Sequence, residues 1–199
     1  MGKIIALVNQ KGGVGKTTSS INLAASLGVL KRRVLLVDLD PQGNASTGIG
    51  IDKSTIKKSI YDLLLDNAEL SEAIIKTKFK NLYVIPATIN LAGADIELME
   101  KSRYEPGFSK GGQLKKYLSQ AKEMFDYIII DCPPSLGILT TNALTAADSV
   151  IIPVQCEFFA LEGIMQLINT IMLAQKNLNP TLDIEGVLLT MLDLSLIHI

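Results

Sequence analysis

The segment Lys11-Gly12-Gly13-Val14-Gly15-Lys16-Thr17-Thr18 decides the fold of this chain. An apolar run at residues 4–8 precedes it, and apolar residues recur at helical spacing over residues 17–30. A glycine-rich loop between a strand and a helix is the context that a phosphate-binding loop requires. Glycines let the backbone wrap closely around a phosphate, and the N-terminus of the following helix favours its negative charge. The segment therefore predicts a nucleotide site.

Each residue of this loop has an expected role. Lys16 would reach the β- and γ-phosphates, and the Thr17 hydroxyl would ligate Mg²⁺. The other members complete the predicted nucleotide-binding set: Lys11, Gly12, Gly13, Val14, Gly15 and Thr18. The standard pattern GxxxxGK[ST] is not met, because Gln10 occupies its first glycine position; the loop matches the deviant form KGGxGK[ST]. A glycine-rich turn without a ligand is the alternative, and it does not account for this match in its strand–helix context.

Strand-like and helix-like runs alternate outward from this loop. Continuous apolar runs stand at residues 4–8, 34–37, 82–85, 127–130, 150–154 and 184–190. Helical patterns lie between them, at residues 60–65, 91–99, 114–124, 139–146 and 161–175, and the Pro- and Gly-rich residues 102–112 predict a loop. Apolar runs of this kind indicate strands buried on both faces. We therefore expect an α/β protein with the three-layer P-loop NTPase fold, a mostly parallel sheet with helices on both faces.

Carboxylates follow two of the predicted strands. Asp38 and Asp40 end the second run, and Asp131 ends the fourth. Ligands of open α/β sheets bind at the carboxyl ends of the strands, so we expect these acids beside the phosphate loop. Asp131 would hold Mg²⁺ through water, and Asp40 and Thr17 are the other candidate metal ligands. The alternative is that acids at strand ends only begin turns.

Composition excludes several other classes of protein. The 199 residues carry a net charge of −1, which gives no electrostatic footprint for nucleic acid on the chain as a whole. Cys132 and Cys156 are not part of a CxxC pair, which excludes a disulfide framework and the usual zinc spacings. No run approaches the ~18 apolar residues of a membrane helix, and no signal peptide is recognisable. A cytoplasmic location without membrane binding is expected.

Five stretches together resemble one family of ATPases. They are Lys11–Thr18, Val37-Asp38-Leu39-Asp40-Pro41-Gln42-Gly43-Asn44, Val84-Ile85-Pro86-Ala87, Ile130-Asp131-Cys132-Pro133-Pro134-Ser135-Leu136-Gly137 and Pro153-Val154-Gln155-Cys156-Glu157. The combination resembles the ParA/MinD branch of P-loop ATPases and, within it, the Soj-like ParA chromosome and plasmid partition ATPases. The likeness extends from Met1 to about Asp193.

The resemblance implies an activity and partners. It implies Mg²⁺-dependent hydrolysis of ATP by a homodimer that encloses two ATP molecules. Lys11 would cross to the partner's nucleotide and Asp40 would position or activate the attacking water, so that Lys11, Lys16 and Asp40 are the catalytic residues. The dimer would bind DNA without sequence preference, associate with the nucleoid, and be stimulated by a ParB-like centromere-binding protein. GTP is disfavoured, because residues 190–193 keep only Asp193 of the NKxD signature.

The resemblance stops after Asp193. We therefore expect a P-loop ATPase domain at residues 1–193, incomplete at its C-terminus, and a tail at residues 194–199 that does not resemble the family, in which His198 has no role. The final strand would lack its covering helix, and poor solubility and weak DNA binding would follow.

Three alternatives remain open at this point. A MinD-like membrane-cycling ATPase would need a C-terminal amphipathic helix with a basic face, and residues 84–87 and 153–157 favour ParA instead. An iron–sulfur member of the superfamily would need cysteine ligands at a dimer seam, and Cys132 and Cys156 lack the cysteine-glycine-glycine context. A non-hydrolysing nucleotide switch would differ from a partition ATPase in that it would not release phosphate.

Overall fold

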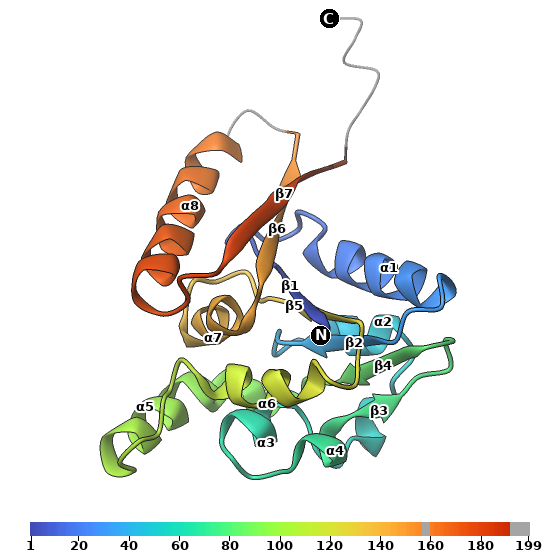
Figure 1. The fold of residues 1–199 in the computed structure, drawn as a ribbon, viewed down its shortest axis with the longest axis vertical. Coiled ribbons are helices and arrows are strands. Elements are labelled where there is room, and N and C mark those ends of the chain that lie inside the picture. The colour runs from blue at the N-terminus through green and yellow to red at the C-terminus, as the bar shows by residue number, and fades with distance from the viewer. Residues whose placement is uncertain (157–159, 192–199) are drawn as a thin grey trace, which may run out of the picture.

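A seven-stranded sheet forms the centre of the computed structural model, which describes residues 1–156 and 160–191. Its strand order is β3-β4-β2-β5-β1-β6-β7 (Figure 1). The strands are β1 (Lys3–Leu7), β2 (Val34–Asp38), β3 (Ile75–Lys76), β4 (Leu82–Ile85), β5 (Tyr127–Asp131), β6 (Ser149–Gln155) and β7 (Asp183–Thr190). Neighbouring strands run parallel except β3, which pairs antiparallel with β4. The expected α/β fold class, with a mostly parallel sheet, is confirmed.

Helices cover both faces of this sheet. The α-helices are α1 (Lys16–Val29), α2 (Asn44–Gly48), α3 (Ile60–Leu64), α4 (Leu70–Ala73), α5 (Ala94–Tyr104), α6 (Gln113–Ala121), α7 (Ile138–Ala146) and α8 (Ala160–Asn177). Two short 3₁₀ helices, η1 (Lys53–Thr55) and η2 (Ile89–Gly93), complete the set for the described residues. Helices α1 and α2 pack on one face, and α3 to α8 lie on the other (Figure 1).

Alternation along the strands explains the three layers. In β1, Ile4 and Ala6 belong to the core beneath α3 to α8, whereas Ile5 and Leu7 belong to the core beneath α1. Successive side chains of a strand point to opposite faces. Because both faces are covered, strands such as β2 are buried at every position. This is why the strands appear in the sequence as continuous apolar runs.

Several boundaries differ from the sequence-based expectation. Residues 102–104 belong to the last turn of α5 rather than to a loop. Lys101 and Arg103 stand in that last turn, where the negative end of the helix dipole favours cations. The short elements α2, α4 and β3 were not predicted, because two to five residues are too few to show a period. Each of the six predicted apolar runs overlaps a strand.

The last strand differs from the others in its exposure. Within the described residues β7 pairs only with β6, and apolar side chains such as Val187 and Leu189 are exposed. An uncovered final strand was the expectation from the sequence. Asp193 and the tail at residues 194–199, with His198, lie outside the described residues, as does Glu157. None of the described helices is long and apolar enough to cross a bilayer.

Candidate nucleotide-binding site

The predicted phosphate loop joins β1 to α1. Gly13 (φ 76°) and Gly15 (φ 86°) adopt left-handed backbone conformations, and Gly15 is the N-cap of α1. Residues other than glycine rarely adopt these φ values. A Cβ added at Gly12 or Gly13 would meet no atom within 4 Å. The loop therefore presents its bare backbone to open space, which is the geometry that a phosphate group needs.

A cavity of about 390 Å³ lies against this loop at the carboxyl ends of the strands. The loop forms one side through Gly12, Gly13, Gly15, Lys16, Thr17 and Thr18, and the other lining residues are Asp40, Gln42, Asn44, Pro134 and Met191. Residues from four separate segments of the chain thus converge on one hollow, at the edge where open α/β sheets bind their ligands.

Lys16 is held inside this site. Its side chain is buried, and its Nζ donates a hydrogen bond to the Lys11 carbonyl at 3.0 Å. Burial lowers the pKa of the Lys16 ammonium, and the nearby negative charge of Asp131 opposes that shift. A buried cation is stabilised when an anion approaches it. The electrostatics of Lys16 therefore suit a phosphate in the cavity.

Asp131 ends β5, between Leu7 of β1 and Asp38 of β2 in the register of the sheet. It is fully buried, and its Oδ1 accepts a hydrogen bond from the Ser20 hydroxyl at 2.9 Å. Burial, with the charge of Asp38 adding to it, raises the pKa of Asp131 to about 7, while the Thr17 and Ser20 hydroxyls act in the opposite direction. Its Oδ2 is buried without a hydrogen-bond partner among the described residues.

An unpartnered buried carboxylate oxygen is costly, and a cation would relieve that cost. Asp131 Oδ2 therefore fits a metal site beside the phosphate loop. Within residues 1–156 and 160–191, no three His, Cys, Asp or Glu side chains gather as a complete ligand set. A metal ion here would depend on Asp131, Thr17, water and phosphate oxygens, which is how Mg²⁺ is bound at phosphoryl-transfer sites.

The two carboxylates near the end of β2, Asp38 and Asp40, have different positions. Strand β2 ends at Asp38, which is fully buried and accepts hydrogen bonds at Oδ2 from the Ser46 N–H (2.8 Å) and the Ser46 hydroxyl (2.7 Å). It anchors α2 and does not line the cavity. Asp40 lies in the turn beyond the strand, where its Oδ1 accepts from the Gln42 N–H at 2.9 Å, and it lines the cavity. Asp38 therefore lies beside Asp131 at the end of β2 without lining the cavity, whereas Asp40 reaches the cavity from the turn that follows.

Other residues that hold the loop were not predicted. The Asn9 side chain donates to the Pro153 carbonyl at 2.7 Å and accepts from the Lys11 N–H at 2.9 Å, which ties the start of the loop to β6. Ser20 lies one helical turn after Lys16, a spacing that could have revealed it. The Thr190 hydroxyl donates to the Val14 carbonyl at 2.8 Å. Asn9 and Thr190 carry no local sequence signal. Lys11 itself is exposed.

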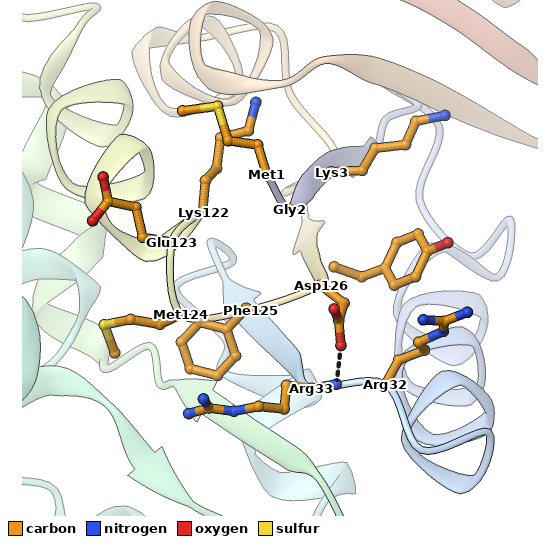
Figure 2. A pocket seen from close by; sticks show the side chains of 11 residues that line it. Met1, Gly2, Lys3, Arg32, Arg33, Lys122, Glu123, Met124, Phe125 and Asp126 are labelled. Carbon is orange, nitrogen blue, oxygen red and sulfur yellow. Dashed lines mark hydrogen bonds between the residues drawn. The ribbon is translucent and has the colours of Figure 1, made fainter.

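A second hollow, of about 620 Å³, lies at the opposite edge of the sheet (Figure 2). It is lined by several cations, of which Lys3, Arg33 and Lys122 have structural partners. The Arg33 guanidinium lies 5.5 Å from the centre of the Phe125 ring, and its backbone N–H donates to Asp126. Lys3 and Lys122 are paired with carboxylates outside the hollow. These cations hold the amino ends of the strands together, so this hollow is not the candidate site.

The phosphate loop, the parallel sheet and the buried carboxylate on the neighbouring strand define an α/β protein with a P-loop NTPase-like fold. A family model described as "AAA domain" matches residues 2–184. The chain is 61% identical over 193 residues to the sporulation initiation inhibitor protein Soj of Bacillus subtilis, covering 97% of this chain and 74% of Soj. It is 53% identical to the chromosome partitioning protein ParA of Myxococcus xanthus, covering 97% of this chain and 66% of that protein.

A solved structure is also similar. Cobyrinic acid a,c-diamide synthase from Mycobacterium smegmatis, with bound ADP and magnesium, superposes with a TM-score of 0.90 at 42% identity, covering 98% of this chain and 77% of that one. The chain therefore belongs to the AAA-domain family, among the Soj/ParA chromosome-partitioning ATPases. The family resemblance drawn from the sequence is confirmed.

Proposed function

We propose that this chain binds Mg²⁺·ATP at the phosphate loop and hydrolyses it to drive the partition of a chromosome or plasmid. The observation that carries the proposal is the cavity lined by Lys16 and the glycine loop, with the unpartnered Asp131 Oδ2 buried behind it, close enough for its charge to act on Lys16. The similarity to Soj and the ADP and magnesium in the structural relative support it. That relative is named as a diamide synthase, but its identity is 42% against 61% for Soj, so partition is favoured.

The residues of the site divide between binding and positioning. Lys16 and the loop N–H groups would hold the β- and γ-phosphates, and Thr17 and Asp131 would hold Mg²⁺, directly or through water. Bound Mg²⁺ supplies positive charge at the phosphate oxygens. Asp40 is partly exposed, lines the same cavity and accepts a hydrogen bond from the Gln42 N–H, which supports a role in orienting an attacking water.

Lys11 has a different place in the proposal. It is exposed at the start of the loop, while its backbone carbonyl accepts from Lys16 and its N–H donates to Asn9. We propose that its side chain reaches the nucleotide of a second subunit, so that two chains enclose two ATP molecules. A cation supplied in this way stabilises charge on the transferring phosphoryl group. The ATP-bound dimer would then bind DNA non-specifically at the nucleoid in the cytoplasm and respond to a ParB-like partner.

Phosphate release tests the proposed activity. Purified chain should release phosphate from ATP in the presence of Mg²⁺, more slowly from GTP, and not in excess EDTA. Nucleotide binding without phosphate release would instead support a non-hydrolysing switch. ATP-dependent pelleting with liposomes, rather than retention on DNA, would support a MinD-like cycle and contradict partition on the nucleoid.

A further inference from the structure

The end of β7 contacts the phosphate loop, although the two segments are far apart in sequence. The Thr190 hydroxyl donates to the Val14 carbonyl at 2.8 Å. The methyl group of Thr190 would lie 3.4 Å from a Cβ built at Gly15, so it packs against the loop backbone. The next residue, Met191, lines the nucleotide cavity.

The backbone of the loop explains why this contact matters. Gly13 and Gly15, on either side of Val14, have left-handed φ values, a backbone pattern found in loops whose N–H groups bind an anion. Val14 itself is buried. A buried carbonyl requires a donor, and Thr190 supplies it from β7.

The position of Thr190 is fixed by the sheet. Thr190 pairs with Gln155 of β6, and its carbonyl accepts from the Cys156 N–H at 3.4 Å. Strand β6 pairs in turn with β1, the strand that leads into the loop, and Asn9 bonds to Pro153 of β6. The adjacent strands β6 and β7 therefore hold the loop at two points, through Asn9 at its start and through Thr190 at Val14. Figure 1 shows β7 at the edge of the sheet beside β6.

We infer that Thr190 is a positioning residue, whose hydroxyl keeps the phosphate loop in its binding conformation before nucleotide arrives. The inference rests on the proposed function in that the ligand is Mg²⁺·ATP. A loop already in its bound conformation loses less freedom on binding, which raises affinity. Thr190 thus acts on nucleotide affinity and KM, whereas kcat depends on groups that touch the reacting atoms.

Two substitutions separate the hydroxyl of Thr190 from its methyl group. Thr190→Val keeps the shape and removes the donor; Thr190→Ser keeps the donor and removes the methyl group. We expect Thr190→Val to weaken binding of a non-hydrolysable Mg²⁺·ATP analogue, and to raise KM, by roughly tenfold with kcat little changed. Thr190→Ser should stay within about twofold of wild type. Thr181→Val is the matched control, because its hydroxyl bonds to Asn179 near the other end of β7.

Hydrogen exchange of the loop amides in nucleotide-free protein provides a readout that does not depend on ATP. Exchange over residues 11–16 should be faster in Thr190→Val than in wild type, Thr190→Ser or Thr181→Val. Equal affinity and equal exchange in Thr190→Val and wild type would overturn the inference. The inference would also be overturned if Thr181→Val or Thr190→Ser lost as much nucleotide affinity as Thr190→Val does. A wild-type chain that does not bind ATP contradicts the proposed function, and loop exchange then still decides the role of Thr190.

Discussion

Ser46→Ala tests the assignment of Asp38 as a structural carboxylate. The Ser46 hydroxyl donates to Asp38 Oδ2 at 2.7 Å and accepts from the Ala87 N–H at 3.2 Å, and both Ser46 and Asp38 are fully buried. Removing the hydroxyl deletes a hydrogen bond to a carboxylate and leaves a buried N–H without its partner. Contributions of this kind sum to about 3 kcal/mol of unfolding free energy. For a chain of this size the melting temperature should fall by roughly 6–12 °C.

The same substitution should change the pH dependence of stability. Burial raises the pKa of Asp38, and the two bonds from Ser46 lower it. Loss of the hydroxyl therefore raises that pKa further. A carboxyl group whose pKa is raised by folding stabilises the folded state at pH values below its pKa in the unfolded chain. This stabilisation is lost as the pH rises through the pKa of the folded state. The destabilisation by Ser46→Ala should be larger at about pH 8 than at about pH 4.5.

Urea denaturation at both pH values measures these effects. Ser119→Ala is the control, because its hydroxyl is exposed and bonds only to the Lys115 carbonyl one turn earlier in α6. It should change the unfolding free energy by less than about 0.5 kcal/mol. A Ser46→Ala variant as stable as the Ser119→Ala variant, or one whose loss of stability is greater at the lower pH, would refute the structural role of Asp38.

Two further predictions concern catalysis and assembly. Asp40→Asn keeps an oxygen for the Gln42 N–H but removes the charge, so it should leave ATP affinity within about twofold and slow steady-state phosphate release by about a hundredfold; normal turnover would exclude Asp40 from orienting the water. Lys11→Ala should spare nucleotide binding by the single chain and abolish ATP-dependent dimerisation in light-scattering measurements, and a variant that still dimerises with ATP would contradict the trans role of Lys11.

The fold was predictable where neighbouring residues in the sequence indicate the secondary structure. The loop between β1 and α1 is recognisable because its glycines, lysine and threonine are contiguous. Five of the six apolar runs mark strands because both faces of the sheet are covered there, whereas the sixth run is the exposed strand β7. Strand β3 was not predictable, because two residues gain their pairing only from β4. The sequence predicts the end of α5 too early, because the glycines that follow this helix indicate a loop over the whole of residues 102–112.

The site was predictable in its chemical groups and less so in its contacts. Lys16, Asp40 and Asp131 are positioned by the loop and by strand ends, which sequence patterns indicate. The different positions of Asp38 and Asp40 were not predictable, because they depend on where β2 ends and on the bond between Asp38 and Ser46, which lies eight residues after Asp38. Thr190 is 176 positions from Val14 in the chain. Only the folded sheet brings these two residues together.

Calorimetric titration of nucleotide into wild type and Lys16→Ala tests the central claim most directly. Lys16 is the buried cation of the cavity, so its loss should weaken Mg²⁺·ATP binding by roughly a hundredfold, corresponding to about 3 kcal/mol. Lys57→Ala, a change at an exposed lysine outside the cavity, should bind as wild type does. Wild type and Lys57→Ala should bind ATP in a Mg²⁺-dependent manner, and Lys16→Ala should bind it about a hundredfold more weakly. Equal affinity in all three proteins would contradict the assignment of residues 11–18 as the ATP site.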